Sequence, residues 1–147
     1  MKILVAVDFS DASESVVARA SALAGPLGAE VWLIHVAEPD PDFVGFAAGP
    51  QFKRDLVAED LHRDHASLEE MAAGIREGGI PCTPLLIQGP TVEKILAEAD
   101  KLAVDLIVIG SHGKGAFKQM LFGSVSQGIL QGSGVPVVVV PTRHPGR

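Results

Sequence analysis

The sequence predicts a single α/β domain built on a five-stranded parallel sheet with helices on both of its faces. Two observations lead to this fold class. Short apolar runs alternate with longer segments of helical periodicity along almost the whole chain, and 47% of the 147 residues are hydrophobic, enough for one substantial core. We therefore expect residues 1–147 to form one domain without an internal repeat or a linker.

The first strand is expected over residues 2–7, a β-rich run that ends at Asp8. The first helix follows over residues 10–27, with Ser10 or Asp11 as its cap and a glycine-proline pair and a further glycine at its end. Its predicted buried face consists of Val16, Val17, Ala20, Leu23, Ala24 and Leu27.

A second strand is expected over residues 30–36 and a long helix over residues 53–77. Between them, residues 37–51 are rich in proline and glycine and form a loop, either a lid over a pocket or a mobile insertion. The moderately periodic face of the long helix comprises Leu56, Asp60, Leu61, Leu68, Met71, Ala72 and Ile75.

The third strand, over residues 80–87, contains Pro81 and Pro84. Because proline cannot donate a ladder hydrogen bond, this strand is expected at an edge of the sheet. Gly89-Pro90 then opens a helix that runs to about Leu102.

The fourth strand, over residues 104–109, is apolar throughout and is expected at the centre of the sheet. A glycine-rich loop follows it. A short helix over residues 124–131 and a fifth strand over residues 135–140 complete the predicted sheet.

The glycine-rich loop is the most informative stretch of the chain. Gly110, Gly113, Gly123 and Ser124 lie between a buried strand and a helix, an arrangement that holds phosphate in parallel α/β proteins. Asp8 also follows a strand, and ligands of such sheets bind outside the carboxyl ends where the strand order reverses. The pattern therefore predicts a nucleotide site between the first and fourth strands.

Three common phosphate-binding motifs are excluded. The turn after the first strand, residues 7–11, has no glycine and so no dinucleotide fingerprint. Gly113-Lys114 lacks both the glycine five residues earlier and the following Ser or Thr of a P-loop. The third strand ends in Ile87-Gln88-Gly89, without the aspartate of a phosphorylated receiver domain.

The remaining pattern resembles the universal stress protein family. The resemblance covers nearly the whole chain and is carried by Asp8, Gly89-Pro90, Gly110-x2-Gly113-x9-Gly123-Ser124 and the run Val135–Val140. It implies a fold like that of adenine nucleotide alpha hydrolases, with strand order 3-2-1-4-5, usually dimeric. The spaced glycines with the following serine are those of the members that bind ATP.

The resemblance also implies a role for each site residue. Asp8 would contact the nucleoside, and the Val36 backbone would border the adenine. The amides of residues 110–113 would line the ribose and phosphate side. The implied cofactor is ATP with Mg²⁺ held mainly through the phosphates. The full set of implied binding residues is Asp8, Val36, Gly110, Ser111, His112, Gly113, Gly123, Ser124 and Val125.

Three functions remain open from the sequence. The first is an ATP-binding regulatory module of the stress response, which we favour because nothing near the glycine loop supplies a clear general base. The second is an enzyme, a slow ATPase or nucleotidyl transferase. The third is a dimeric scaffold that binds no nucleotide.

Charge and composition restrict the partners and the location. A net charge of −6 without a long run of Lys or Arg argues against a nucleic-acid surface. No apolar run approaches the roughly 20 residues of a membrane span. The single cysteine, Cys82, suits a reducing compartment, so we expect a cytoplasmic protein. We also expect a homodimer through the apolar strand at 135–140, because an uncharged edge strand associates unless it is paired.

Overall fold

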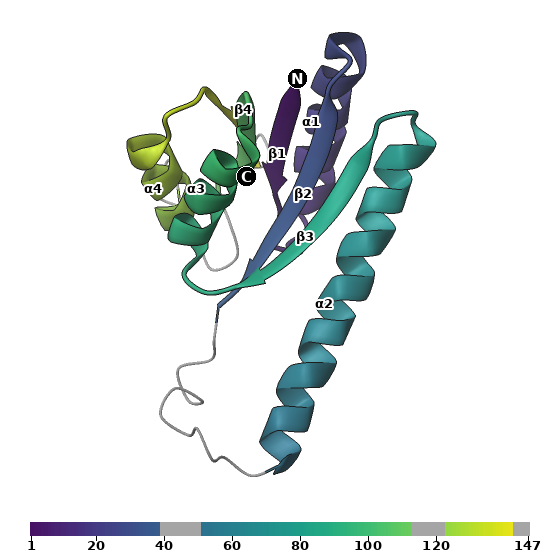
Figure 1. Ribbon diagram of the computed structural model, residues 1–147, viewed down its shortest axis with the longest axis vertical. Helices are drawn as coiled ribbons and strands as arrows, with labels where there is room; N and C mark the ends of the chain where they lie inside the picture. The colour runs from purple at the N-terminus through teal and green to yellow at the C-terminus, as the bar shows by residue number, and fades with distance from the viewer. Residues whose placement is uncertain (39–50, 113–122, 143–147) are drawn as a thin grey trace.

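A five-stranded, wholly parallel sheet organises the molecule (Figure 1). The computed structural model describes residues 1–38, 51–112 and 123–142, and of residues 51–57 the backbone only. The strand order is β3-β2-β1-β4-β5, as expected. The strands are β1 (Lys2–Ala6), β2 (Glu30–Ala37), β3 (Cys82–Gln88), β4 (Leu106–Gly110) and β5 (Val137–Val140).

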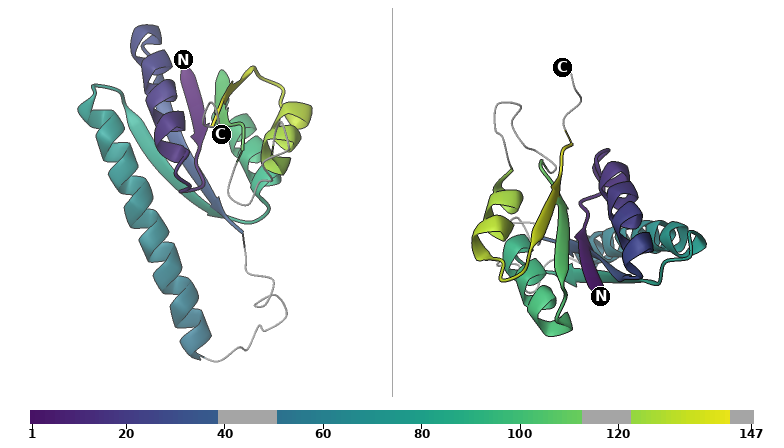
Figure 2. Two further views of the ribbon diagram at one scale, coloured as in Figure 1. Left: turned by 180° about the vertical axis from the view of Figure 1, so that it is seen from behind. Right: turned by 90° about the horizontal axis from the view of Figure 1, so that it is seen from above.

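Helices cover both faces of the sheet, which confirms the predicted fold class (Figure 2). One core cluster lies between the sheet and the first two helices, and the other lies between the sheet and the last two. The helices are α1 (Ser13–Leu27), α2 (Gln51–Glu77), α3 (Thr91–Leu102) and α4 (Ser124–Gly132). Within the described residues, no helix combines the length and the apolarity needed to span a bilayer.

Helix α1 departs from its prediction at its start and ends at Leu27 as expected. It begins at Ser13, its N-cap is Ala12, and no side chain caps it, so the expected cap by Ser10 or Asp11 was wrong. Pro26 lies inside the last turn, and the helix ends at Gly28 in the left-handed conformation with φ of 60°. Of the predicted buried face, Leu23 and Leu27 are exposed, whereas Val16, Ala20 and Ala24 are buried and Val17 is partly buried against the first core cluster.

Helix α2 begins two residues before its predicted start and extends past the sheet in its first half (Figure 1). Its C-terminal half packs on the sheet through Leu68, Ala72 and Ile75. Asp60, which the periodicity placed on the same face, is exposed because this part of the helix lies beyond the strands. The predicted loop over residues 37–51 falls mostly on residues 39–50, which lie outside the described part of the chain.

The edge position predicted for β3 is confirmed. The strand begins at Cys82, so Pro81 precedes it, and only Pro84 lies within the ladder. The carbonyl of Pro81 accepts a hydrogen bond of 2.8 Å from the Val31 amide. The two prolines thus reduce the number of backbone donors in a strand at the edge of the sheet.

The strands around the glycine loop are shorter than predicted. Val104 follows the C-cap of α3, and its amide donates to the Ala99 carbonyl in the last turn of that helix, so β4 begins only at Leu106. Val135 is held by the Ser133 hydroxyl instead of a neighbouring strand, so β5 begins at Val137. In both places a local hydrogen bond replaces the ladder that the apolar run suggested.

Candidate functional site

The candidate site lies at the carboxyl ends of β1 and β4, which are neighbours in the sheet. From β1 the chain proceeds outward through β2 and β3, and it then returns to the other side of β1 for β4 and β5. The strand order therefore reverses between β1 and β4. Parallel α/β sheets bind ligands at such a point because the connections diverge and leave a crevice.

The register brings three predicted site residues to one level across the sheet. Ala6 of β1 is paired with Ile34 of β2, so two residues further Asp8 is level with Val36. Val5 is paired with Val108 of β4, so three residues further Asp8 is level with Ser111. The predicted nucleoside contact, adenine border and start of the glycine loop thus lie at one level near the carboxyl ends of three adjacent strands.

The carboxylate of Asp8 organises the turn into α1. Its Oδ1 atom accepts a hydrogen bond of 3.0 Å from the Ser10 amide and one of 3.3 Å from the Ser13 hydroxyl. Ser13 is the first residue of α1 and is buried. Asp8 is therefore tied to the start of the first helix without being its N-cap, which fixes the position of this charge at the end of β1.

The second wall of the site is the end of β4. Gly110 is paired with Val140, and the Ser111 amide donates to the Val140 carbonyl at 2.9 Å. A side chain at Gly110 would approach Thr142 to 3.0 Å and Val16 to 3.2 Å. Close packing of β4 against Thr142 and α1 thus favours glycine here, in addition to any approach of a ligand.

Thr142, just after β5, holds the first residues of the glycine loop. Its amide donates to the Ser111 hydroxyl at 3.0 Å, and its Oγ1 accepts from the His112 amide at 3.2 Å. The Ser111 hydroxyl also lies 3.1 Å from Nδ1 of His112. Ser111 is buried and His112 half-buried, so both are held at the base of the loop.

The residues that follow the glycine loop form hydrogen bonds with the carbonyls of Gly110 and Ser111 at its start. The Gly123 amide donates to the Ser111 carbonyl at 2.8 Å. The buried hydroxyl of Ser126 lies 2.7 Å from the Gly110 carbonyl and 3.1 Å from that of Ser111. Gly113 and the rest of residues 113–122 lie outside the described part of the chain, but the two ends of this segment are joined.

Helix α4 opens toward the site with features that suit an anion. Gly123 is its N-cap, in an extended conformation and without a side-chain cap, and its first turn carries no acidic side chain. The first amides of a helix lack acceptors within the helix and concentrate positive potential. Ser124, the first residue, is exposed, whereas Val125 is half-buried against the second core cluster.

The end of β2 forms the remaining described part of the candidate site. Val36 is buried in the second core cluster and paired with Ile87 of β3. Two residues later, Oε1 of Glu38 accepts hydrogen bonds from the Thr91 hydroxyl at 2.8 Å and the Thr91 amide at 3.3 Å. Glu38 thereby caps α3 from another element, since the N-cap residue Pro90 supplies no side-chain cap.

Several of these residues were not found from the sequence. Ser126 carried one signal, its place three residues before the buried Ile129 on the same helical face. Thr142, Ser13 and Glu38 act across distances of 31, 5 and 53 residues, and no local pattern predicts such partners.

Comparison with known proteins decides the family. The model of the universal stress protein family matches residues 1–141. This chain belongs to the universal stress protein family. Two relatives illustrate the match. A universal stress protein of Thermus aquaticus is 35% identical over 94% of this chain and 96% of its own length. Universal stress protein YxiE of Bacillus subtilis is 31% identical over 95% of this chain and 97% of its own length.

Solved structures of universal stress proteins share the fold. Protein MJ0577, a universal stress protein of Methanocaldococcus jannaschii, superposes with a TM-score of 0.85 at 27% identity, over 97% of this chain and 96% of its own. A universal stress protein of Archaeoglobus fulgidus was solved in complex with dAMP. It superposes with a TM-score of 0.70 at 25% identity, over 95% of this chain and 97% of its own. Another, at 22% identity, was solved in complex with cAMP.

Proposed function

We propose that this universal stress protein is an ATP-binding regulatory module of the stress response. The observation that carries the proposal is the joining of Asp8, Val36 and the ends of the glycine loop at the carboxyl ends of three adjacent strands, beside the open N-terminus of α4. The adenine nucleotide in the complex of the Archaeoglobus relative supports the same class of ligand.

In the proposed complex, Asp8 contacts the nucleoside and the Val36 backbone borders the adenine. The amides of Gly110, Ser111, His112 and Gly113 line the ribose and phosphate side. Gly123, Ser124 and Val125 hold the phosphates at the start of α4, where the first amides of the helix and the helix dipole favour negative charge. Mg²⁺ would be held mainly by phosphate oxygens, the hard ligands that it prefers.

Two further properties belong to the proposal. The protein acts as a homodimer through β5, which is an edge strand of the sheet that the described residues form. It works in the cytoplasm, where its single cysteine, the buried Cys82, stays reduced.

Release of the bound ligand tests the proposal against a nucleotide-free scaffold. Freshly purified protein is denatured by heat, and the supernatant is separated on a nucleotide column. We expect an adenine nucleotide in an amount that approaches one per chain. A supernatant without nucleotide, from protein that also fails to bind added ATP, would favour the scaffold.

A turnover measurement separates the regulatory module from an enzyme. The protein is incubated with labelled ATP and Mg²⁺, and the products are followed for several hours. We expect less than about one turnover per chain in that time, because retention of the nucleotide is what a regulatory module requires. Sustained release of ADP or AMP would instead identify a slow enzyme.

A further inference from the structure

The turn after β1 has a backbone conformation that needs support. Phe9, the residue after Asp8, has φ of 61°, in the left-handed region. Among the described residues one other non-glycine side chain, Ala103, has positive φ, and it is the C-cap of α3, where this conformation is common. Phe9 precedes a helix and is bulky, so its conformation must be held by its surroundings.

His35 of β2 contacts the residues on both sides of Asp8. Its Nδ1 atom lies 2.8 Å from the Val7 carbonyl, and because a carbonyl only accepts, Nδ1 carries the proton. Its ring centroid lies 4.3 Å from that of Phe9, with the planes inclined by 39°. One imidazole therefore fixes Val7 by a hydrogen bond and Phe9 by ring contact.

The hydrogen bond replaces the ladder where β1 ends. The Val7 amide still donates to the Ile34 carbonyl of β2 at 3.0 Å, but the Val7 carbonyl is bound by the side chain of His35. The next peptide is thereby released from the sheet, and the chain turns through Asp8 and Phe9 into α1. The imidazole ends the strand at a defined residue.

The imidazole is itself held in place. The His35 side chain is 13% exposed, and its Nε2 atom lies 3.8 Å from Oδ2 of Asp64 on α2. This distance exceeds a hydrogen bond, so Asp64 flanks the ring without accepting a proton from it. Packing in the sheet and the carboxylate on α2 leave the ring few alternative orientations.

We propose that His35 is a positioning residue for nucleotide binding: it holds the left-handed turn at Phe9 and so presents Asp8 at the level of Val36 and Ser111. The inference rests on the proposed function and names a residue that acts on the site through Val7 and Phe9, without contact to the ligand. An ordinary core histidine would stabilise the fold without affecting the turn selectively.

A double-mutant cycle on His35 and Phe9 tests this role. His35→Phe keeps an aromatic ring but removes the donor to Val7, and we expect it to weaken ATP binding about tenfold. Phe9→Gly places at the turn a residue that adopts positive φ without support. In that background His35→Phe should weaken ATP binding less than about twofold, because the turn no longer depends on the imidazole.

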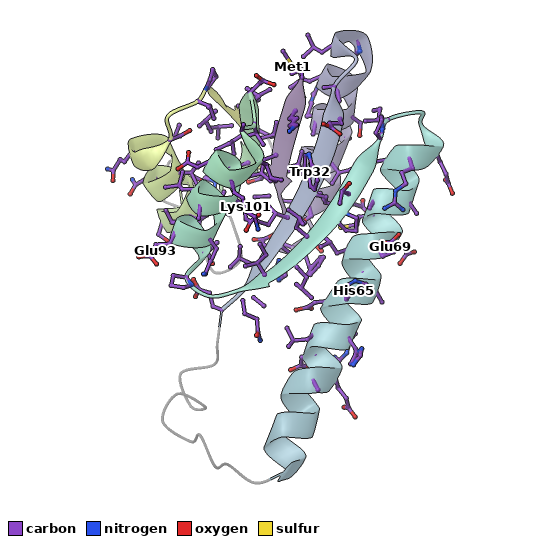
Figure 3. All side chains as sticks on the ribbon, in the orientation of Figure 1. Met1, Trp32, His65, Glu69, Glu93 and Lys101 are labelled. Carbon is purple, nitrogen blue, oxygen red and sulfur yellow. The ribbon has the colours of Figure 1, made fainter. Side chains whose placement is uncertain are left out.

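Two amide variants provide the rescue test. His35→Asn carries a donor near the position of Nδ1 and should keep ATP affinity within about threefold, whereas His35→Gln carries its donor near Nε2 and should lose about tenfold. If His35→Phe does not fold, the comparison of the Asn and Gln variants still tests the role of His35. His65→Ala is the control, because His65 is an exposed histidine of α2, labelled in Figure 3.

Calorimetry with ATP is combined with urea unfolding of the nucleotide-free proteins, so that a loss of affinity is separated from a loss of fold. An equal weakening by His35→Phe in both backgrounds, or no weakening, overturns the positioning role and leaves the proposed function intact. Asn and Gln variants of equal affinity overturn it as well. If the wild-type protein binds no ATP, the proposed function fails and the inference with it.

Discussion

At the scale of single residues, the Ser126 hydroxyl joins the end of β4 to the first turn of α4 (2.7 Å to the Gly110 carbonyl). Ser126→Ala would leave two buried carbonyls with fewer donors, so we expect the free energy of unfolding to fall by about 1–3 kcal/mol. Urea unfolding followed by fluorescence of Trp32, the single tryptophan (Figure 3), measures it. Ser15→Ala, on the exposed side of α1, is the matched control. Equal stability of the two variants would contradict the role of this hydroxyl.

Ser124 differs from Ser126 because it is exposed at the start of α4. Under the proposed function, Ser124→Ala removes one hydrogen bond to phosphate, which corresponds to about 1–3 kcal/mol, or tenfold to a hundredfold in ATP affinity. The free energy of unfolding should stay within about 0.5 kcal/mol. Gln127→Ala, exposed on the same helix, is the control for affinity and stability. Wild-type ATP affinity of the Ser124→Ala protein would show that Ser124 does not contact the nucleotide.

Cys82 provides a residue-scale prediction about reactivity. Burial raises the pKa of its thiol to about 11, because the thiolate is desolvated beside β2 and α2. Since the thiolate is the reactive form, a thiol reagent at pH 8 should label the native protein far more slowly than the unfolded protein. The folded protein should gain reactivity only as the pH rises toward 11. Rapid labelling of the native protein at pH 8 would show that the site opens readily.

At the scale of elements, Gly128 shows why local propensity can mislead. A glycine in the middle of a short helix costs about 1 kcal/mol relative to alanine, which predicts that Gly128→Ala stabilises α4. The structure predicts the opposite sign. A Cβ atom at Gly128 would lie 2.8 Å and 3.0 Å from the two methyl carbons of Val92 on α3. Val92 is β-branched and cannot easily turn away.

We therefore expect Gly128→Ala to lower the free energy of unfolding by about 1–3 kcal/mol through overpacking. In a Val92→Ala background the clash is gone, and the same substitution should be neutral or stabilising. Urea unfolding of the four proteins in this cycle gives the answer. A stabilising Gly128→Ala in the wild-type background would mean that α3 and α4 move apart without cost.

The elements themselves followed from the sequence because apolar runs and helical periodicity depend on neighbouring residues. Their ends did not. Helix α1 starts only at Ser13, after a turn in which Asp8 Oδ1 binds the Ser10 amide and the Ser13 hydroxyl, and β5 starts at Val137, after Ser133 has bound the Val135 amide. Such ends are set by individual side-chain hydrogen bonds, which no average pattern contains.

At the scale of the whole molecule, the strand order and the location of the candidate site could be predicted, since the topology brings the ends of β1 and β4 together. The supporting contacts could not. Thr142 and Glu38 reach the site from other elements, and the left-handed conformation of Phe9 has no signal in its residue type. These contacts exist only after the sheet has formed.

The proposed homodimer has a test designed from the register. The Ile107 amide donates to the Pro136 carbonyl and the Ser111 amide to that of Val140, so even-numbered residues of β5 face β4. The amide of Val139 then points to the outer edge. Val139→Pro removes that donor while leaving the β4 ladder, and it should give a monomer. Light scattering at micromolar concentration should give twice the mass of one chain for the wild type. A wild-type mass near 15.4 kDa would contradict the dimer.

Under the proposed function, the joined ends of β1, β4 and α4 form a site for an adenine nucleotide with phosphates. Calorimetry of the whole protein with ATP in the presence of Mg²⁺, compared with AMP and GTP, tests it most directly. We predict that ATP binds, that AMP binds more weakly because it lacks the phosphates held by α4, and that GTP binds more weakly because its base differs. ATP should also raise the midpoint of thermal unfolding. The absence of both heat of binding and thermal protection at millimolar ATP would contradict the proposed site.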